Sequence, residues 1–344
     1  MITGKDKTNN YFLTSLTRIS DFADKEVEIK ALDRDDWENG DYIACDVTGA
    51  PSALYSIELS NGRMAPVLEG DCLIGTFGKR AATLEGVGDW EAIEADGNLH
   101  ALTGAGLFGK ATSISLLLPR LMSLSYRGHV VSNGKKQVMQ DFVTPVNPHK
   151  FSTPVIMLIG TSMSAGKTTT GRIIVHELKK MENKVVGAKL TGAGRLRDIL
   201  AYSDAGADAI IDFVDAGLPS TVVPKSKFQH SLDYLLSRIE SLKADVAVIE
   251  AGASPLEPYN SDLVVEAVKK NISLLVLSAS DPYAVLGVQS AFGITPDLIT
   301  GPATNTSAAV ELVEKLTGIK ALNLLDPASV PQLCEILEAR IQNG

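Results

Sequence analysis

Residues 160–169, GTSMSAGKTT, carry the clearest chemical pattern in the sequence. An apolar run ends at Gly160, a loop of small residues follows, and Gly166-Lys167-Thr168 opens a run with helical periodicity. This is the order of a phosphate-binding loop, in which backbone N–H groups and the positive end of a helix converge on an anion. Lys167 is expected to place a charge at the β- and γ-phosphates, and the Thr168 hydroxyl to serve as a Mg²⁺ ligand.

The spacing of this loop is one residue longer than the usual G-x-x-x-x-G-K-[ST], so Thr161 stands where the first glycine is usual. The alternative is a glycine-rich turn with an accidental Lys-Thr pair, and the flanking strand and helix patterns favour the phosphate loop. The predicted nucleotide-binding residues are Gly160, Thr161, Ser162, Met163, Ser164, Ala165, Gly166, Lys167, Thr168 and Thr169.

Three later segments each end an apolar strand pattern in a charged residue. Lys189 closes the first, with the alternative of an ordinary surface lysine, and Asp212 closes the second. Glu250 closes the third, where a carboxylate after buried positions is costly unless it is paired or metal-bound. Since ligands of parallel sheets bind beyond the carboxyl ends of the strands, these residues are expected at one edge.

From these positions we predict Lys167, Lys189 and Glu250 as catalytic residues and Thr168, Asp212 and Glu250 as Mg²⁺ ligands. Asp204 and Asp208 compete with Asp212 for its role, and a helix-capping carboxylate is the alternative for Glu250. A further contact, to adenine, is expected at Asn305 after a late strand. ATP is favoured over GTP because no Asn-Lys-x-Asp motif follows such a strand.

The elements that must hold these residues alternate regularly from residue 155 onward. Apolar strands alternating with helices indicate a mostly parallel, doubly wound α/β sheet, which gives a P-loop domain over 151–344. Strands are predicted at 155–160, 184–190, 209–215, 245–252, 273–280 and 297–303. Helices are predicted at 168–181, 195–207, 230–242, 263–271, 306–318 and 330–342.

The pattern of residues 1–150 predicts a smaller β-rich domain of unassigned role, either a barrel or a sandwich. Short strands are expected at 41–47, 52–59, 72–77, 82–87 and 99–112. The glycines of 104–109 are interpreted as a turn or bulge and not as a dinucleotide fingerprint, because no βαβ unit surrounds them. Segment 113–124 is expected to be a buried strand or a short helix broken at Pro119, and Asn133-Gly134 predicts a hairpin turn.

Composition narrows the classes of partner. The 344 residues are 45% apolar with a net charge of −9, which argues against a nucleic-acid or anionic-membrane surface. No apolar run reaches membrane-spanning length, and the N-terminus has no signal core, so the expected location is the cytoplasm. The three cysteines lack metal-ligand spacing. A small acidic substrate is the expected partner, and a homo-oligomer is retained because acidic P-loop enzymes are often dimers.

The loop also resembles that of dethiobiotin synthetase and its relatives, including the cobyrinic acid amide synthases. In that group the glycine likewise comes one residue early, as in Gly160-Thr161. Lys189 with Thr191-Gly192 is similar to the family's substrate-lysine segment, and Glu250 with Gly252 to its Mg²⁺-binding segment. Ser162-Met163-Ser164 replaces the family's usual Asp-Thr-Glu. The resemblance implies a Mg-ATP-dependent ligase-type activity.

In layout the chain is similar to the family of P-loop proteins that includes D-glutamate N-acetyltransferases. Those proteins also place an N-terminal domain before a Gly-Thr-x-x-x-x-Gly-Lys loop. An Asp-Phe-Val segment follows, here residues 212–214, and then a glutamate segment with a Pro-Tyr-Ser-like stretch, here 250–261. This resemblance implies a CoA-dependent N-acyltransferase acting on an acidic amino acid.

The function expected from the sequence is therefore a Mg²⁺- and ATP-dependent enzyme of the kinase or ligase type. It would transfer phosphoryl to a small carboxylate-bearing metabolite, or activate it, with Lys189 and Arg195 steering the substrate. Two alternatives stay open: the CoA-dependent N-acyltransferase, and a nucleotide-switched regulatory NTPase.

Overall fold

The computed structural model describes residues 7–8, 11–49 and 56–341. These residues divide into two compact units. The first holds the chain up to Pro145 together with segments 193–197 and 213–223, and the second holds the remainder. The division differs from a single boundary near residue 150 because two segments of the later sequence cluster with the first unit.

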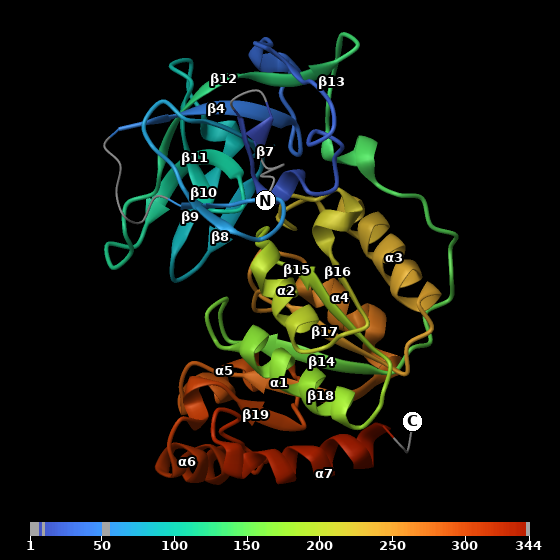
Figure 1. Cartoon of the computed structure of the whole chain (residues 1–344). Coiled ribbons are helices and arrows are strands. Elements are labelled where there is room, and N and C mark those ends of the chain that lie inside the picture. The colour runs from blue at the N-terminus through green and yellow to red at the C-terminus, as the bar shows by residue number, and fades with distance from the viewer. Residues whose placement is uncertain (1–6, 9–10, 50–55, 342–344) are drawn as a thin grey trace, which may run out of the picture. The chain divides into compact units, whose positions relative to one another are not determined.

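The first unit is built on a small closed barrel. Strand β7 pairs with β4, β4 with β12, β12 with β10, β10 with β11, and β11 again with β7, which closes the ring. Closure leaves these strands without a free edge, and their inward side chains form an apolar core. The β-rich fold expected from the sequence is confirmed, in its barrel form (Figure 1).

The bounds of its strands follow the turn chemistry of the sequence. They are β1 Lys7–Thr8, β2 Tyr11–Leu13, β3 Glu28–Lys30, β4 Tyr42–Thr48, β5 Ser56–Glu58, β6 Met64–Pro66, β7 Cys72–Phe77, β8 Lys79–Ala82, β9 Gly86–Asp89, β10 Asn98–Thr103, β11 Leu107–Ile114, β12 Ser123–Ser132 and β13 Lys135–Lys136. Residues 52–55 of the strand expected at 52–59 lie outside the described residues. Asn133 and Gly134 both have positive φ and turn β12 into β13, as the hairpin prediction requires.

Two predictions for this unit need correction. A strand was expected at 82–87, but residues 83–85 form the turn between β8 and β9 and take no part in the pairing of these two strands. Segment 115–122 is neither a buried strand nor a helix: it is the loop between β11 and β12, and Leu116 and Leu117 are 101% and 95% exposed. Pro119, which has no N–H to donate, fits a loop better than either predicted element.

The later segments of the first unit are held by buried polar contacts within it. Glu58 is 1% exposed and accepts hydrogen bonds from the backbone N–H groups of Leu196, at 2.7 Å, and Arg197, at 2.9 Å. Ser220 donates its hydroxyl to the Lys79 carbonyl at 2.6 Å. A buried carboxylate is stabilised by such N–H donors, so Glu58 explains why segment 193–197 belongs to this unit.

The second unit is a parallel sheet with the order β16-β15-β17-β14-β18-β19 among the described residues. Every residue of β14, β15 and β17 is buried, so both faces of the sheet are covered, as continuous apolar strands predict. Strand β14 lies between β17 and β18: the connection after β14 runs through α1 to β15 on one side, whereas the connection after β17 runs through α4 to β18 on the other side. Such a switch point opens a binding crevice at the carboxyl ends of the strands. The doubly wound α/β fold is confirmed (Figure 1).

Its strands are β14 Val155–Gly160, β15 Val185–Thr191, β16 Ala209–Asp212, β17 Val246–Ala251, β18 Ile272–Ser278 and β19 Leu298–Thr300. Its helices are α1 Lys167–Lys180, α2 Leu196–Asp204, α3 Lys225–Ser241, α4 Ser261–Val268, α5 Pro282–Phe292, α6 Ser307–Thr317 and α7 Val330–Ile341. The first two residues of α2 belong to the first unit and the rest to the second.

Two elements differ from the sequence prediction. Strand β16 ends at Asp212, and a 3-10 turn, Phe213–Ala216, replaces the rest of the expected strand. Helix α5 is absent from the predicted set, although its start carries ordinary signals: Asp281 accepts from two backbone N–H groups and Pro282 occupies the first turn. Within the described residues, no helix has both the length and the apolar character needed to cross a membrane.

Candidate nucleotide site

The loop between β14 and α1 has the local geometry of an anion cradle. Gly166 stands before α1 with φ of 95°, a left-handed conformation that favours glycine. A Cβ added at Gly160 would lie 2.9 Å from the Lys167 Nζ, so this glycine gives the lysine room to fold back along the loop. Because α1 begins at Lys167, the partial positive charge of its N-terminus lies at the end of the loop.

Lys167 is buried, 1% exposed, and its Nζ donates to the Ser162 carbonyl at 2.6 Å. Burial lowers its pKa to about 8, while the negative charge of Glu250 acts in the opposite direction. A single carbonyl is a modest partner for a buried ammonium, which makes the loop a place where an added anion is stabilised.

The predicted metal ligands Thr168 and Glu250 are brought together. The Thr168 hydroxyl donates to Oε2 of Glu250 at 2.9 Å, and Glu250 is 2% exposed. The pair forms because β17, which carries Glu250, lies beside the loop strand β14. Mg²⁺ binds oxygen at about 2.1 Å in an octahedron, so neighbouring ligand oxygens lie roughly 3 Å apart. The observed separation fits that requirement.

Asp212 is not part of this pair. It lies on β16, and β15 separates it from Glu250 on β17. Neighbouring strands are about 4.8 Å apart, so the two carboxylates sit on strands roughly 10 Å from one another. Of its competitors, Asp208 lies at the amino end of β16, paired with Lys179 at 2.7 Å, and Asp204 ends α2. Among the described residues, no three His, Cys, Asp or Glu side chains gather as a metal cluster.

Lys189 lies between the two carboxylate strands, in register with Asp212 on one side and Glu250 on the other. It is 5% exposed, so it is not a surface lysine. Its Nζ lies 2.5 Å from Oδ2 of Asp198 and 3.9 Å from Oε1 of Glu250. Burial acts to lower the pKa of Lys189, but these carboxylates outweigh it and raise that pKa above its ordinary value. Lys189 is therefore charged beside the loop.

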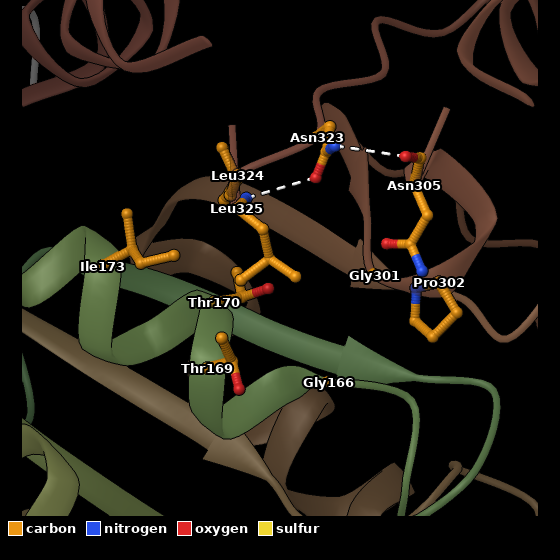
Figure 2. A pocket seen from close by; sticks show the side chains of 10 residues that line it. All are labelled: Gly166, Thr169, Thr170, Ile173, Gly301, Pro302, Asn305, Asn323, Leu324 and Leu325. Carbon is orange, nitrogen blue, oxygen red and sulfur yellow. Dashed lines mark hydrogen bonds between the residues drawn. The ribbon is translucent and has the colours of Figure 1, made fainter. Parts of the chain in front are cut away.

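Asn305 lies at a pocket of about 140 Å³ that runs from the start of α1 to the residues after β19 (Figure 2). This volume is well below the roughly 300–1,000 Å³ of pockets for whole drug-sized ligands, so it suits one ring system. Asn323 spans the upper side: its amide donates to the Asn305 carbonyl at 3.4 Å and accepts from the Leu325 N–H at 3.2 Å. The lining residues are Gly166, Thr169, Thr170, Ile173, Gly301, Pro302, Asn305, Asn323, Leu324 and Leu325.

A buried group of hydroxyls fixes the pocket to the loop. Thr170 of α1 lies 2.8 Å from the Thr300 hydroxyl and 3.3 Å from that of Ser278, at the ends of β19 and β18. All three are nearly inaccessible to solvent. These hydrogen bonds tie the first turn of α1, which lines the pocket through Thr170, to the ends of β18 and β19.

The sequence did not identify three residues of this region. Tyr202 and Asp198 of α2 contact Glu250 and Lys189, and Asn323 lines the pocket. Asp198 and Tyr202 share a helical spacing of four, which could have placed them on one face, but nothing in the sequence says what that face meets. Arg195, expected to steer substrate, lies in segment 193–197 of the first unit.

No protein-family model and no curated protein matches the chain. Among solved structures, chloroplast FtsY from Physcomitrella patens matches at 17% identity and TM-score 0.36, over 53% of this chain and 62% of that one. HypB from Helicobacter pylori in complex with nickel matches at 16% identity and TM-score 0.36, over 56% of this chain and 88% of that one. A DUF1611 family protein from Anabaena variabilis matches at 12% identity and TM-score 0.36, over 58% of this chain and 62% of that one. The chain thus spans less than two thirds of the FtsY structure. These are partial likenesses of fold and assign no activity. By its own loop, strand order and Thr168–Glu250 pair, the second unit has the P-loop NTPase fold.

Proposed function

We propose that this chain is a Mg²⁺-dependent nucleotide-binding enzyme that uses ATP to phosphorylate or activate a small acidic molecule. The observation that carries the proposal is the Thr168–Glu250 pair at the mouth of the loop, 2.9 Å apart and beside the buried Lys167. A hydroxyl and a carboxylate at this separation are the protein ligands that Mg²⁺ takes with a nucleotide phosphate. Mg²⁺, when bound, would polarise the phosphate oxygens and neutralise charge that develops on them.

The chain's own residues would bind the phosphates, the base and the acidic substrate. Backbone N–H groups of the loop and the Lys167 ammonium would bind and orient the phosphates. The pocket beside Asn305 would take the base, since its size suits a single ring system and it opens at the same helix end as the loop. ATP is the preferred nucleotide on the sequence evidence. The charged Lys189, held by Asp198 at 2.5 Å, would attract a carboxylate-bearing substrate toward the loop.

A calorimetric titration of Mg-ATP, Mg-GTP and acetyl-CoA tests the cofactor. We expect Mg-ATP to bind, and ADP release to rise when small dicarboxylic or amino acids are supplied. A ligand at a hundred times its dissociation constant stabilises the protein by about 2.7 kcal/mol, so a thermal-shift screen can find that substrate. Tight binding of acetyl-CoA without binding of ATP would replace this proposal with the CoA-dependent N-acyltransferase.

A second candidate is a nucleotide-switched regulator. It is supported by the clustering of segments 193–197 and 213–223, which follow β15 and β16, with the first unit. A nucleotide-dependent change at the ends of these strands would be carried along the chain into that unit. Slow hydrolysis that is insensitive to metabolites and accelerated by a protein partner would favour this candidate.

Nucleotide binding should take up protons near pH 8. Burial holds the pKa of Lys167 at about 8 in the free protein, and adjacent phosphates would raise it. Binding would therefore add about half a proton at pH 8 and little at pH 7, and affinity would fall as the pH rises above 8. Calorimetry in two buffers of different ionisation enthalpy measures this uptake. Equal heats in the two buffers at pH 8 would show that no proton is taken up and that the amine does not meet the ligand's charge.

A further inference from the structure

Tyr202 of α2, in the second unit, contacts the candidate metal ligand Glu250. Its side chain is fully buried, and its hydroxyl donates to Oε2 of Glu250 at 3.0 Å. The Thr168 hydroxyl donates to the same oxygen at 2.9 Å. Thr168 would turn its oxygen toward Mg²⁺ when the ion binds, whereas the Tyr202 bond does not depend on the ion.

Two glycines make room for this ring. A Cβ at Gly171, inside α1, would lie 2.2 Å from the Tyr202 hydroxyl oxygen. A Cβ at Gly187, inside β15, would lie 2.7 Å from the Cδ2 atom of the ring. Glycine is unfavourable in the interior of helices and strands, and there it often marks a close approach by another group. The ring of Tyr202 is that group for both, so helix and strand are shaped around it.

The face of α2 that carries Tyr202 also carries Asp198, which binds the charged Lys189 of the site. Asp198 and Tyr202 are four residues apart and lie on one side of the helix. Asp198 contacts the Nζ of Lys189 at 2.5 Å, and that Nζ lies 3.9 Å from the second oxygen of Glu250. One helix face therefore fixes both the lysine and the carboxylate that the proposed reaction requires.

We propose that Tyr202 is a positioning residue that holds the Glu250 carboxylate beside the Thr168 hydroxyl for Mg²⁺ binding. The proposal rests on the function proposed above. A carboxylate that binds a metal is itself hydrogen-bonded, and loss of such a partner typically weakens metal binding 10–100-fold. Of the two hydroxyls that donate to Glu250 within the described residues, that of Tyr202 would remain in place when Thr168 engages the ion.

The test is a Mg²⁺ titration of nucleotide binding by Tyr202→Phe, followed with a fluorescent ATP analogue and not by turnover. The variant keeps the ring that fills the space at Gly171 and Gly187 and loses only the hydroxyl. We expect the Mg²⁺ concentration at half-saturation to rise about tenfold or more. Affinity for the nucleotide without Mg²⁺ should stay within about twofold of the wild type. Tyr234→Phe is the matched control, since its hydroxyl, on α3, accepts from Arg238 at 3.2 Å.

An unchanged Mg²⁺ half-saturation in Tyr202→Phe overturns the proposal, even if the variant is less stable, because a purely structural role would lower the melting temperature alone. A double-variant cycle with Glu250→Gln adds a second measurement. If Tyr202 acts through Glu250, its substitution has no further effect on Mg²⁺ half-saturation in the Glu250→Gln background, and additive effects contradict it. A wild-type chain that binds no nucleotide at any Mg²⁺ concentration defeats the proposed function, whereas equal wild-type and variant titrations defeat this inference alone.

Discussion

Lys167→Met should weaken nucleotide binding by one to two orders of magnitude while leaving the free protein at least as stable as the wild type. The loss arises because the ammonium is the charge that the loop presents to the phosphates. A hydrogen bond to a charged group contributes about 1.5–3 kcal/mol, so affinity should fall by about 10- to 150-fold. Thermal shift measures both effects together: Mg-ATP should raise the melting temperature of the wild type, and the same concentration should raise that of the variant much less.

The stability part of this prediction follows from the direction of the pKa shift. Burial lowers the pKa of Lys167 from 10.5 to about 8 in the folded chain. The unfolded chain therefore holds more protons between pH 8 and pH 10.5, and the stability supplied by this group rises with pH across that window. Below pH 8 the buried ammonium is a net cost to the free protein. Methionine fills much of the same space without the charge, whereas Lys167→Ala would add a cavity.

Lys269→Ala is the control for this experiment, since the side chain of that lysine is 69% exposed and its ion pair is with the exposed Glu266, at 3.4 Å. It should bind nucleotide as the wild type does. Wild-type affinity in Lys167→Met would refute the assignment of the loop itself. A large loss of stability in Lys167→Met would instead contradict the view that the ammonium is held in the free protein by one carbonyl.

The sequence was sufficient for the parts of the second unit that depend on local pattern. The glycine-bounded loop and the apolar strands specify where Lys167, Lys189 and Glu250 lie along the chain, and parallel sheets bring strand ends to one edge. Strand order could not be obtained in this way. Asp212 is as good a carboxylate as Glu250 by pattern, and only the position of β15 between their strands separates the two.

Contacts over long sequence distances were beyond local pattern. Tyr202 looks like an ordinary apolar position of an amphipathic helix, and its hydroxyl meets a residue 48 positions away. Glu58 lies in a short strand of the barrel, and its donors lie 138 and 139 positions later. The three leucines of 116–118 predict burial, yet Leu116 is fully exposed. An apolar side chain favours burial, but it is buried only where the packed fold has space for it.

Glu250→Gln should separate binding from chemistry. The substitution keeps the size and most hydrogen bonds of the side chain and removes the negative charge that a metal requires. We expect Mg²⁺-dependent turnover to fall by at least about 100-fold, which corresponds to about 2.7 kcal/mol of transition-state stabilisation. Affinity for ATP without Mg²⁺ should be unchanged or higher, because a carboxylate buried near the phosphates repels them.

The same substitution tests whether the neighbouring cations depend on Glu250. Its charge acts to raise the pKa values of both Lys167 and Lys189, so the variant should lower them. Lys189 retains Asp198 at 2.5 Å and stays charged, whereas the hydrogen-bond partner of the Lys167 Nζ among the described residues is the Ser162 carbonyl and not a second carboxylate. The pH above which ATP binding weakens should therefore move below 8 in Glu250→Gln. Glu266→Gln, on the exposed side of α4, is the matched control. Turnover that survives Glu250→Gln would place the metal ligand elsewhere on the carboxyl edge, with Asp212 the next residue to substitute.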